Sequence, residues 1–453
     1  MSNQRRLESM VSDVEEAVNL GSFVSYRQSW DYVRRLETVK SKIDGLATKK
    51  AAKQCVPLYE MFLSGCYEKA DEVDDSSGCF GEFFQELFCS WIEARQNAGY
   101  EAEQSVYQMF KWMDNDEYGF LHDVQESLVE VLDREGLALF EARIKSRFRE
   151  ALFKADPTNR KRIYDYPFDV RRNAAILKSI CLAKEDTDSY QSLCDELGTT
   201  PKDCENIAKI KRKNRQLRSA LIWVDKGLDL EKTATWPNES AWGLPALKRN
   251  LLVELGRKKD AVESAWSGFE AYPSEFAYDE LMKYVSRKDR ERWHKKAMKT
   301  VLSASLPEII NLSVKTQEWE ILRKSVENAG HEELEAISHF TTEKAAEELE
   351  KIHPIEAAKI YRAMGMRIVK GKKSRHYDIA LDHLRKAKKL YSENKRKDEW
   401  LFLVEEVRRD HSRKYSFIGG FERIVSGSYA GRYQSFEERT KKRWEKRLSD
   451  AEE

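Results

Sequence analysis

The sequence predicts an all-α protein in which helical hairpins stack as a solenoid. The chain of 453 residues is 41% hydrophobic and 35% charged, but it has only 9 prolines and 20 glycines, so residues that break helices are scarce. Apolar residues recur every three or four positions along the chain, without a convincing β-type alternation. A single helical hairpin cannot bury its apolar face alone, which favours the stacking of neighbouring hairpins.

Several apolar stripes with helical spacing occur in the N-terminal third. In residues 27–46 the predicted stripe consists of Trp30, Val33, Leu36, Val39 and Ile43. Residues 56–67 and 80–95 repeat the helical spacing, and Tyr107, Phe110 and Trp112 continue it. A further helix is predicted after Gly136. The segment 153–169 contains two prolines and several turn-forming residues, which indicates a break in the array.

A repeat-like unit follows in residues 256–273. Gly256, Ala261, Gly268 and Pro273 occupy positions that resemble the tetratricopeptide repeat. In that repeat, a glycine forms the inter-helix turn, small residues allow two helices to approach closely, and a proline ends the unit. We therefore expect Gly268 to lie at a close helix crossing.

Two further segments carry weaker versions of this pattern. One contains Tyr377, Ala380, Leu384 and Ala387, and the other contains Ala220 and Gly227. Their irregular spacing predicts a degenerate tetratricopeptide-like superhelix. We expect an N-terminal helical-hairpin region at residues 1–155, a tetratricopeptide-like repeat region at 156–425 and a C-terminal tail helix at 426–453.

Several stretches, taken together and in order, resemble a known family. They are SWDYVRRLETVKSKID, EKADEVDDSSGCFGEFFQELFCSWIEARQ, GRKKDAVESAWSGFEAYPS, HPIEAAKIYRAM and HYDIALDHLRKAKKLY with FLVEEVRRDHSRKYSF. Over about residues 25–420, the chain resembles the helical region that follows the zinc finger in bacterial SWIM zinc-finger proteins. The same region also occurs alone, as an uncharacterised bacterial domain family.

The chain departs from the SWIM pattern at the zinc finger itself. That finger needs C-x-C followed by C-x-H to give zinc four ligands, and neither motif occurs here. The chain therefore resembles the stand-alone form, and the resemblance supplies no catalytic, cofactor-binding or metal-binding residue. It implies a partner among nucleic-acid-processing proteins. We expect a non-catalytic scaffold that binds another protein.

The alternative is a nucleic-acid-binding accessory protein. One basic stretch contains Lys209, Lys211, Arg212, Lys213, Arg215 and Arg218. The other, within residues 370–397, begins with Lys370, Lys372, Lys373 and Arg375. If such residues line one groove, they can follow phosphates. The near-balance of 79 basic and 78 acidic residues argues against a protein that coats nucleic acid.

Other patterns favour ordinary structural roles. Asp114, Asp116 and Gly119 match part of a calcium-binding loop, but Tyr118 and Gln125 occupy positions that need oxygen ligands, so a turn at the end of a helix is expected. The acidic residues at 68–75 are expected at a solvated helix end. The seven cysteines form no C-x-x-C pair, which favours buried thiols. With no long apolar run and no signal-like N-terminus, we expect a cytoplasmic protein.

Overall fold

The computed structural model describes residues 3–47, 51–155, 162–233 and 241–428, and these residues form successive helices joined by short turns. The chain divides into two compact units, Met1–Leu255 (unit 1) and Gly256–Glu453 (unit 2). The predicted all-α fold class is confirmed.

Unit 1 contains the following helices: α1 (Asn3–Val18), α2 (Tyr26–Leu46), α3 (Ala52–Glu68), η1 (Ala70–Glu72), α4 (Cys79–Asn97), α5 (Ala102–Asp114), α6 (Gln125–Val131), α7 (Arg134–Lys154), η2 (Ile163–Asp165), α8 (Phe168–Ala183), α9 (Thr187–Leu197), α10 (Pro201–Lys213), α11 (Leu217–Thr233) and α12 (Leu244–Glu254).

Unit 2 contains the following helices: α13 (Lys258–Ala271), α14 (Glu275–Tyr284), α15 (Arg290–Val301), α16 (Leu306–Thr316), α17 (Trp319–Asn328), α18 (His331–Ala336), α19 (His339–Ile352), α20 (Pro354–Lys370), η4 (Ser374–His376), α21 (Tyr377–Glu393), α22 (Lys397–His411) and α23 (Tyr415–Ser426).

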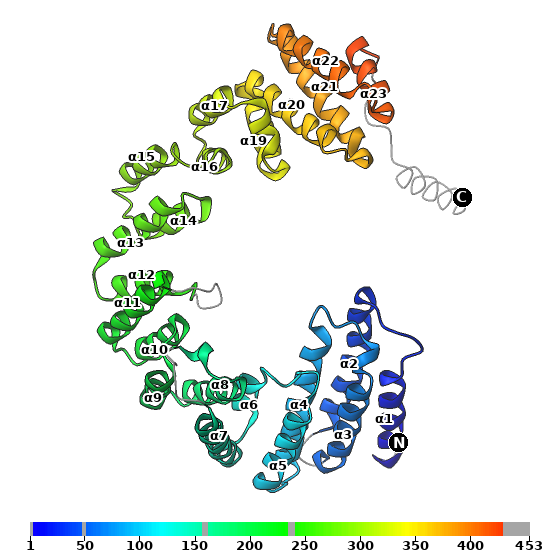
Figure 1. The fold of residues 1–453 in the computed structure, drawn as a ribbon, viewed down its shortest axis with the longest axis vertical. Helices are drawn as coiled ribbons and strands as arrows, with labels where there is room; N and C mark the ends of the chain where they lie inside the picture. Colours follow the sequence, from blue (N-terminus) through cyan, green and yellow to red (C-terminus); the bar gives the residue numbers. More distant parts are fainter. Residues whose placement is uncertain (1–2, 48–50, 156–161, 234–240, 429–453) are drawn as a thin grey trace. The chain divides into compact units, whose positions relative to one another are not determined.

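Within each unit, helices that follow one another in the chain pack against each other as hairpins (Figure 1). In unit 1, α3 packs on α4, α7 on α8, and α10 on α11. In unit 2, α13 packs on α14, α16 on α17, and α20 on both α19 and α21. This succession of local contacts is the helical-hairpin solenoid that the sequence predicts.

Local sequence signals set where these helices begin. The carboxylate of Asp133 accepts a hydrogen bond from Gly136 N at 2.8 Å and so caps α7. Thr200 and Asp203 form a capping box at α10, which has Pro201 at its first position. These caps satisfy backbone N–H groups that have no partner inside the helix.

The core of unit 1 is rich in aromatic residues. The stripe predicted for residues 80–95 is confirmed, since its apolar members lie buried on α4. The assignment of Trp30 and Tyr107 to apolar stripes is wrong, because these side chains are 55% and 58% exposed. Ser29 takes the core-facing position one turn before Val33, which leaves Trp30 at the flank of α2.

The repeat-like unit at residues 256–273 is helical as predicted, but Gly268 does not have the predicted close contact. Gly256 has φ +76°, a conformation that side-chain-bearing residues rarely adopt, and it precedes α13. Pro273 follows the end of the helix, and Ala261 is fully buried. The predicted close crossing at Gly268 is wrong, because a Cβ added there would meet nothing within 4 Å. Ala265, one turn earlier, is buried instead.

The second repeat-like segment packs closely against a glycine of α20, Gly365, which lies outside the predicted pattern. Ala380, Leu384 and Ala387 are fully buried on α21, and Tyr377 is 7% exposed, while their assignment to a repeat motif stays a prediction. A Cβ added to Gly365 on α20 would lie 2.7 Å from Leu384 Cγ and 3.1 Å from Ala380 O. The pairing of α20 with α21 therefore depends on the absence of a side chain at Gly365.

The predicted regional boundary at residue 155 lies inside unit 1, where α7 and α8 pack together on either side of it. The division into three regions stays a prediction. Its C-terminal tail lies outside the described residues from residue 429 onward. Among the described helices, none has both the length and the apolar character needed to cross a bilayer.

Candidate functional site

Two cavities lie along α7 in unit 1, and they share lining residues. The first, of about 350 Å³, is bordered by α5, α7 and α8, and the second, of about 580 Å³, by α5 and α7. Arg147 and Glu150 line both. We call the surface formed by these two adjoining cavities the α7 groove, and its other main residues are Glu103, Tyr107, Arg143, Ser146, Lys154, Asp169 and Arg172.

The groove exists because one face of α7 is anchored in the core. Phe140, Ile144 and Phe148 recur every four residues and are at most 5% exposed. They fix the helix so that Arg143 and Arg147, also one turn apart, point toward α5. Core packing therefore fixes the position of α7, while the charged residues Arg143 and Glu150 lie at the surface.

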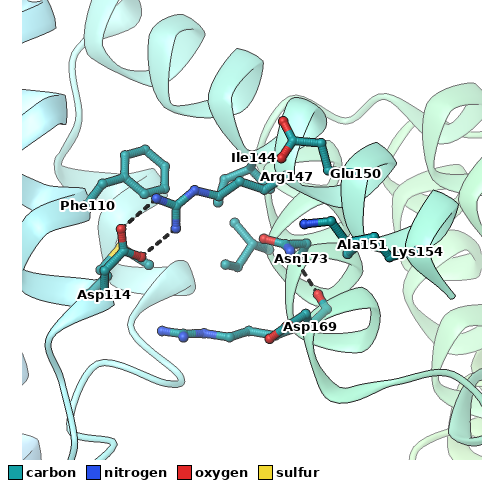
Figure 2. A pocket seen from close by; sticks show the side chains of 12 residues that line it. Phe110, Asp114, Ile144, Arg147, Glu150, Ala151, Lys154, Asp169 and Asn173 are labelled. Atoms are coloured by element: carbon teal, nitrogen blue, oxygen red, sulfur yellow. Dashed lines mark hydrogen bonds and ion pairs between the residues drawn. The ribbon is translucent and has the colours of Figure 1, made fainter.

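Arg147 is held in place by a two-pronged ion pair. Its Nη1 and Nη2 donate to the two carboxylate oxygens of Asp114 at 2.6 and 2.7 Å (Figure 2). These hydrogen bonds hold the pKa of the Asp114 carboxyl below its ordinary value, and the charges of Arg172 and Arg143 act in the same direction. The Arg147 guanidinium also lies 4.3 Å from the centre of the Phe110 ring.

The groove also offers polar groups that can meet a ligand. Ser146 Oγ donates to Glu150 at 3.1 Å, and Asn173 Nδ2 donates to the backbone oxygen of Asp169 at 2.8 Å. Arg172 Nη2 is shielded from solvent without a hydrogen-bond partner among the described residues. A buried donor of this kind favours a ligand that brings an acceptor.

Exposed aromatic side chains lie at and near the groove. Tyr107 lines the larger cavity and is 58% exposed. Phe153, on the last turn of α7, is 93% exposed, and Phe168, which begins α8, is 52% exposed. Aromatic residues together with arginines are enriched at the centres of protein interfaces.

The first predicted nucleic-acid-binding stretch is partly neutralised within unit 1. Lys209 pairs with Glu205 at 2.6 Å, Arg212 with Glu254, and Lys213 with Glu185. The other three residues, Lys211, Arg215 and Arg218, show no ion pair among the described residues. Three of the six predicted cations are therefore engaged in ion pairs, one within α10 and two with other segments of unit 1.

The second stretch also contributes to internal packing. Lys370 Nζ lies 2.8 Å from Glu335 and 3.2 Å from Glu406, and Glu406 also pairs with the buried Arg362 at 2.7 Å. Lys372, Lys373 and Arg375 are exposed between α20 and α21. The two basic stretches belong to different units, and their role in nucleic-acid binding stays a prediction.

The acidic motifs have structural partners. Asp116 accepts hydrogen bonds from the backbone N–H groups of Gly119, Phe120 and Leu121, so it organises the turn after α5. Asp75 accepts from two backbone N–H groups in the first turn of α4, as an N-terminal carboxylate does. Among the described residues, no group of His, Cys, Asp or Glu side chains has the geometry to hold a metal ion.

No curated protein matches this chain. A solved structure titled "Circular tandem repeat protein with novel repeat topology and enhanced subunit contact surfaces" is 13% identical, with a TM-score of 0.17, and the match covers 89% of this chain and 95% of that chain. The resemblance to SWIM zinc-finger proteins gains no support from these matches and stays a prediction. A family model described as "Family of unknown function (DUF6880)" matches residues 15–419, so the chain belongs to that family.

Proposed function

We propose that this protein is a non-catalytic helical-repeat scaffold that binds a partner protein in the α7 groove. The observation that carries this proposal is that two cavities adjoin at Arg147, which lines both and is already held by Asp114 and Phe110. A side chain fixed before binding loses little conformational entropy when the partner arrives.

The dimensions of the groove suit a peptide segment. At a rise of about 1.5 Å per residue, α7 extends about 22 Å from Leu139 to Lys154, the outermost lining residues on that helix. An extended segment of about seven residues spans this distance. The mixture of acidic, basic and aromatic residues along it favours a polypeptide over a small apolar ligand.

The chemistry of the site supports a binding role without catalysis. The Asp114 carboxylate is occupied by Arg147, and its lowered pKa keeps it ionised, so it is a poor proton donor. Outside the groove, burial raises the pKa of Cys89 and Cys194 to about 12, and that of Cys181 and Cys204 to about 11. At neutral pH these thiols are protonated and weakly nucleophilic.

The SWIM resemblance supports a partner that belongs to nucleic-acid-processing machinery, and the composition supports a cytoplasmic location. Direct contact with nucleic acid remains the second hypothesis. The ion pairs of Arg212 and Lys213 weigh against it, because phosphates would compete with carboxylates already in place.

The variant Arg147→Glu tests the proposed binding surface. We expect it to reduce recovery of the partner by about 30-fold, because it reverses the charge at the centre of the groove. The measurement is an affinity purification of the tagged full chain from native lysate, with and without nuclease, quantified by mass spectrometry. Tyr107→Ala should also weaken binding, without disturbing the core.

Arg149→Glu is the matched control, because Arg149 is exposed on the same helix but lines neither cavity. It should retain the partner. Equal loss in Arg149→Glu and Arg147→Glu would contradict the assignment to the α7 groove. Recovery that disappears with nuclease would favour nucleic-acid binding.

A further inference from the structure

Unit 2 contains a cavity of about 400 Å³ between two of its turns. One side is formed by the turn between α13 and α14, and the other by the turn between α15 and α16. The lining residues are Glu270, Ala271, Tyr272, Pro273, Ser274, Thr300, Ser303, Ala304, Ser305 and Glu308. We call this surface the unit 2 pocket.

The turns around the pocket are well defined. Tyr272 N donates to Gly268 O at 3.1 Å, Pro273 prevents further helix, and Ser274 Oγ caps α14 by accepting from Ala277 N. Beneath them, Phe269 and Val301 are fully buried in one apolar cluster with Leu281. The pocket is therefore built on packed helices.

Large apolar side chains surround the pocket without being covered. Tyr272, which lines it, is 81% exposed. Phe276, two residues after the lining residue Ser274, is 76% exposed, and Leu302, next to Ser303, is 54% exposed. Three large exposed apolar residues beside one cavity are typical of a surface that meets a partner.

The charged residues that line the unit 2 pocket are acidic. Its described lining includes two carboxylates, Glu270 and Glu308, and no lysine, arginine or histidine. Glu308 Oε2 is shielded from solvent and has no hydrogen-bond partner among the described residues. A shielded carboxylate oxygen that accepts no hydrogen bond is stabilised most by a donor that is also a cation.

We propose that the unit 2 pocket docks a segment of a partner protein in which a lysine or arginine lies beside an apolar side chain. The cation pairs with Glu308, and the apolar side chain packs on Tyr272 and Phe276. A cavity of about 400 Å³ accommodates the end of such a segment. This pocket lies in a different unit from the α7 groove, and the proposal for it does not depend on the proposal for that groove.

A displayed library of random 12-residue peptides, selected on the full chain, tests this proposal. Enriched peptides should contain Lys or Arg within two positions of Leu, Phe, Tyr or Trp. An enriched peptide is then synthesised with a fluorescent label, and its dissociation constant is measured by anisotropy. Glu308→Gln and Tyr272→Ala should each weaken binding about tenfold.

Three controls separate this site from others. Glu348→Gln and Phe340→Ala change exposed residues of α19 in the same unit, and Arg147→Glu changes the α7 groove. None of them should alter the affinity of the enriched peptide. The proposal is overturned if no basic–apolar peptide is enriched, if enriched peptides are acidic, or if binding is unaffected by Glu308→Gln.

Discussion

Replacing Asp203 with alanine should destabilise unit 1 by about 3–5 kcal/mol, because it leaves the Lys178 ammonium buried without a counter-charge. Lys178 and Asp203 are 8% and 4% exposed, and Lys178 Nζ lies 2.8 and 2.9 Å from the two carboxylate oxygens. Tyr190 Oη and Thr200 Oγ1 donate to the same carboxylate, each at 2.8 Å. The carboxylate thus joins α8, α9 and the cap of α10.

Hydrogen exchange of the full chain, read on peptides from α8 to α10, measures this effect locally. Asp195→Ala is the control, since Asp195 is exposed on α9 and its loss should change stability by less than about 0.5 kcal/mol. The double variant Lys178→Met with Asp203→Leu should recover much of the loss, because it removes both charges. Equal exchange in Asp203→Ala and Asp195→Ala would refute the role assigned to the pair.

The ion pair between Lys178 and Asp203 should make the stability of unit 1 depend on pH. Burial alone would raise the pKa of Asp203, but the Lys178 charge and the Thr200 hydrogen bonds outweigh it, so the folded pKa is lowered. The stabilising contribution is therefore complete above the unfolded pKa of about 3.9 and is lost as pH falls through the folded value. The stability difference between the protein and Asp203→Asn should be constant from pH 5 to 8 and narrow below about pH 4.

Replacing Gly365 with leucine should destabilise the α20–α21 pair by about 3 kcal/mol, because the added side chain must displace Leu384 and the backbone near Ala380. Gly268→Leu is the matched control on α13, where a Cβ meets nothing within 4 Å. There, the higher helix propensity of leucine should stabilise the helix by about 0.5–1 kcal/mol.

Hydrogen exchange on peptides from α20 and α21 should become about 100-fold faster in Gly365→Leu. Peptides from α13 should exchange no faster in Gly268→Leu. Destabilisation of similar size at both glycines would contradict the packing difference between them.

The fold class could be predicted because helix periodicity and turn chemistry are local. Gly256 and Pro273 follow directly from backbone rules, since Gly256 has a positive φ and Pro273 comes just after the end of α13. The close crossing predicted at Gly268 is wrong, because the spacing of a repeat motif alone does not reveal which helix face meets a neighbour. Gly365, which does make such a contact with Leu384, belongs to no recognised spacing.

The α7 groove could not be predicted from local sequence signals, because it depends on contacts between distant segments. Arg143 and Arg147 are four residues apart, a signal visible in the sequence, but the partner of Arg147 is 33 residues away at Asp114. The stretch 209–218 contains no acidic residue, and two of its cations find their counter-ions far along the chain, such as Glu254, 42 residues from Arg212. A run of one charge is thus a poor guide to free charge when tertiary contacts supply the counter-ions.

Site-specific photo-crosslinking tests the central proposal most directly. A photoreactive amino acid replaces Ser146 in the α7 groove or, as a control, the exposed Glu37 on α2, and the full chain is irradiated in native lysate treated with nuclease. The proposal predicts a discrete protein adduct from position 146 that is absent from position 37 and is lost in Arg147→Glu. No adduct from position 146, or the same adducts from both positions, would contradict it.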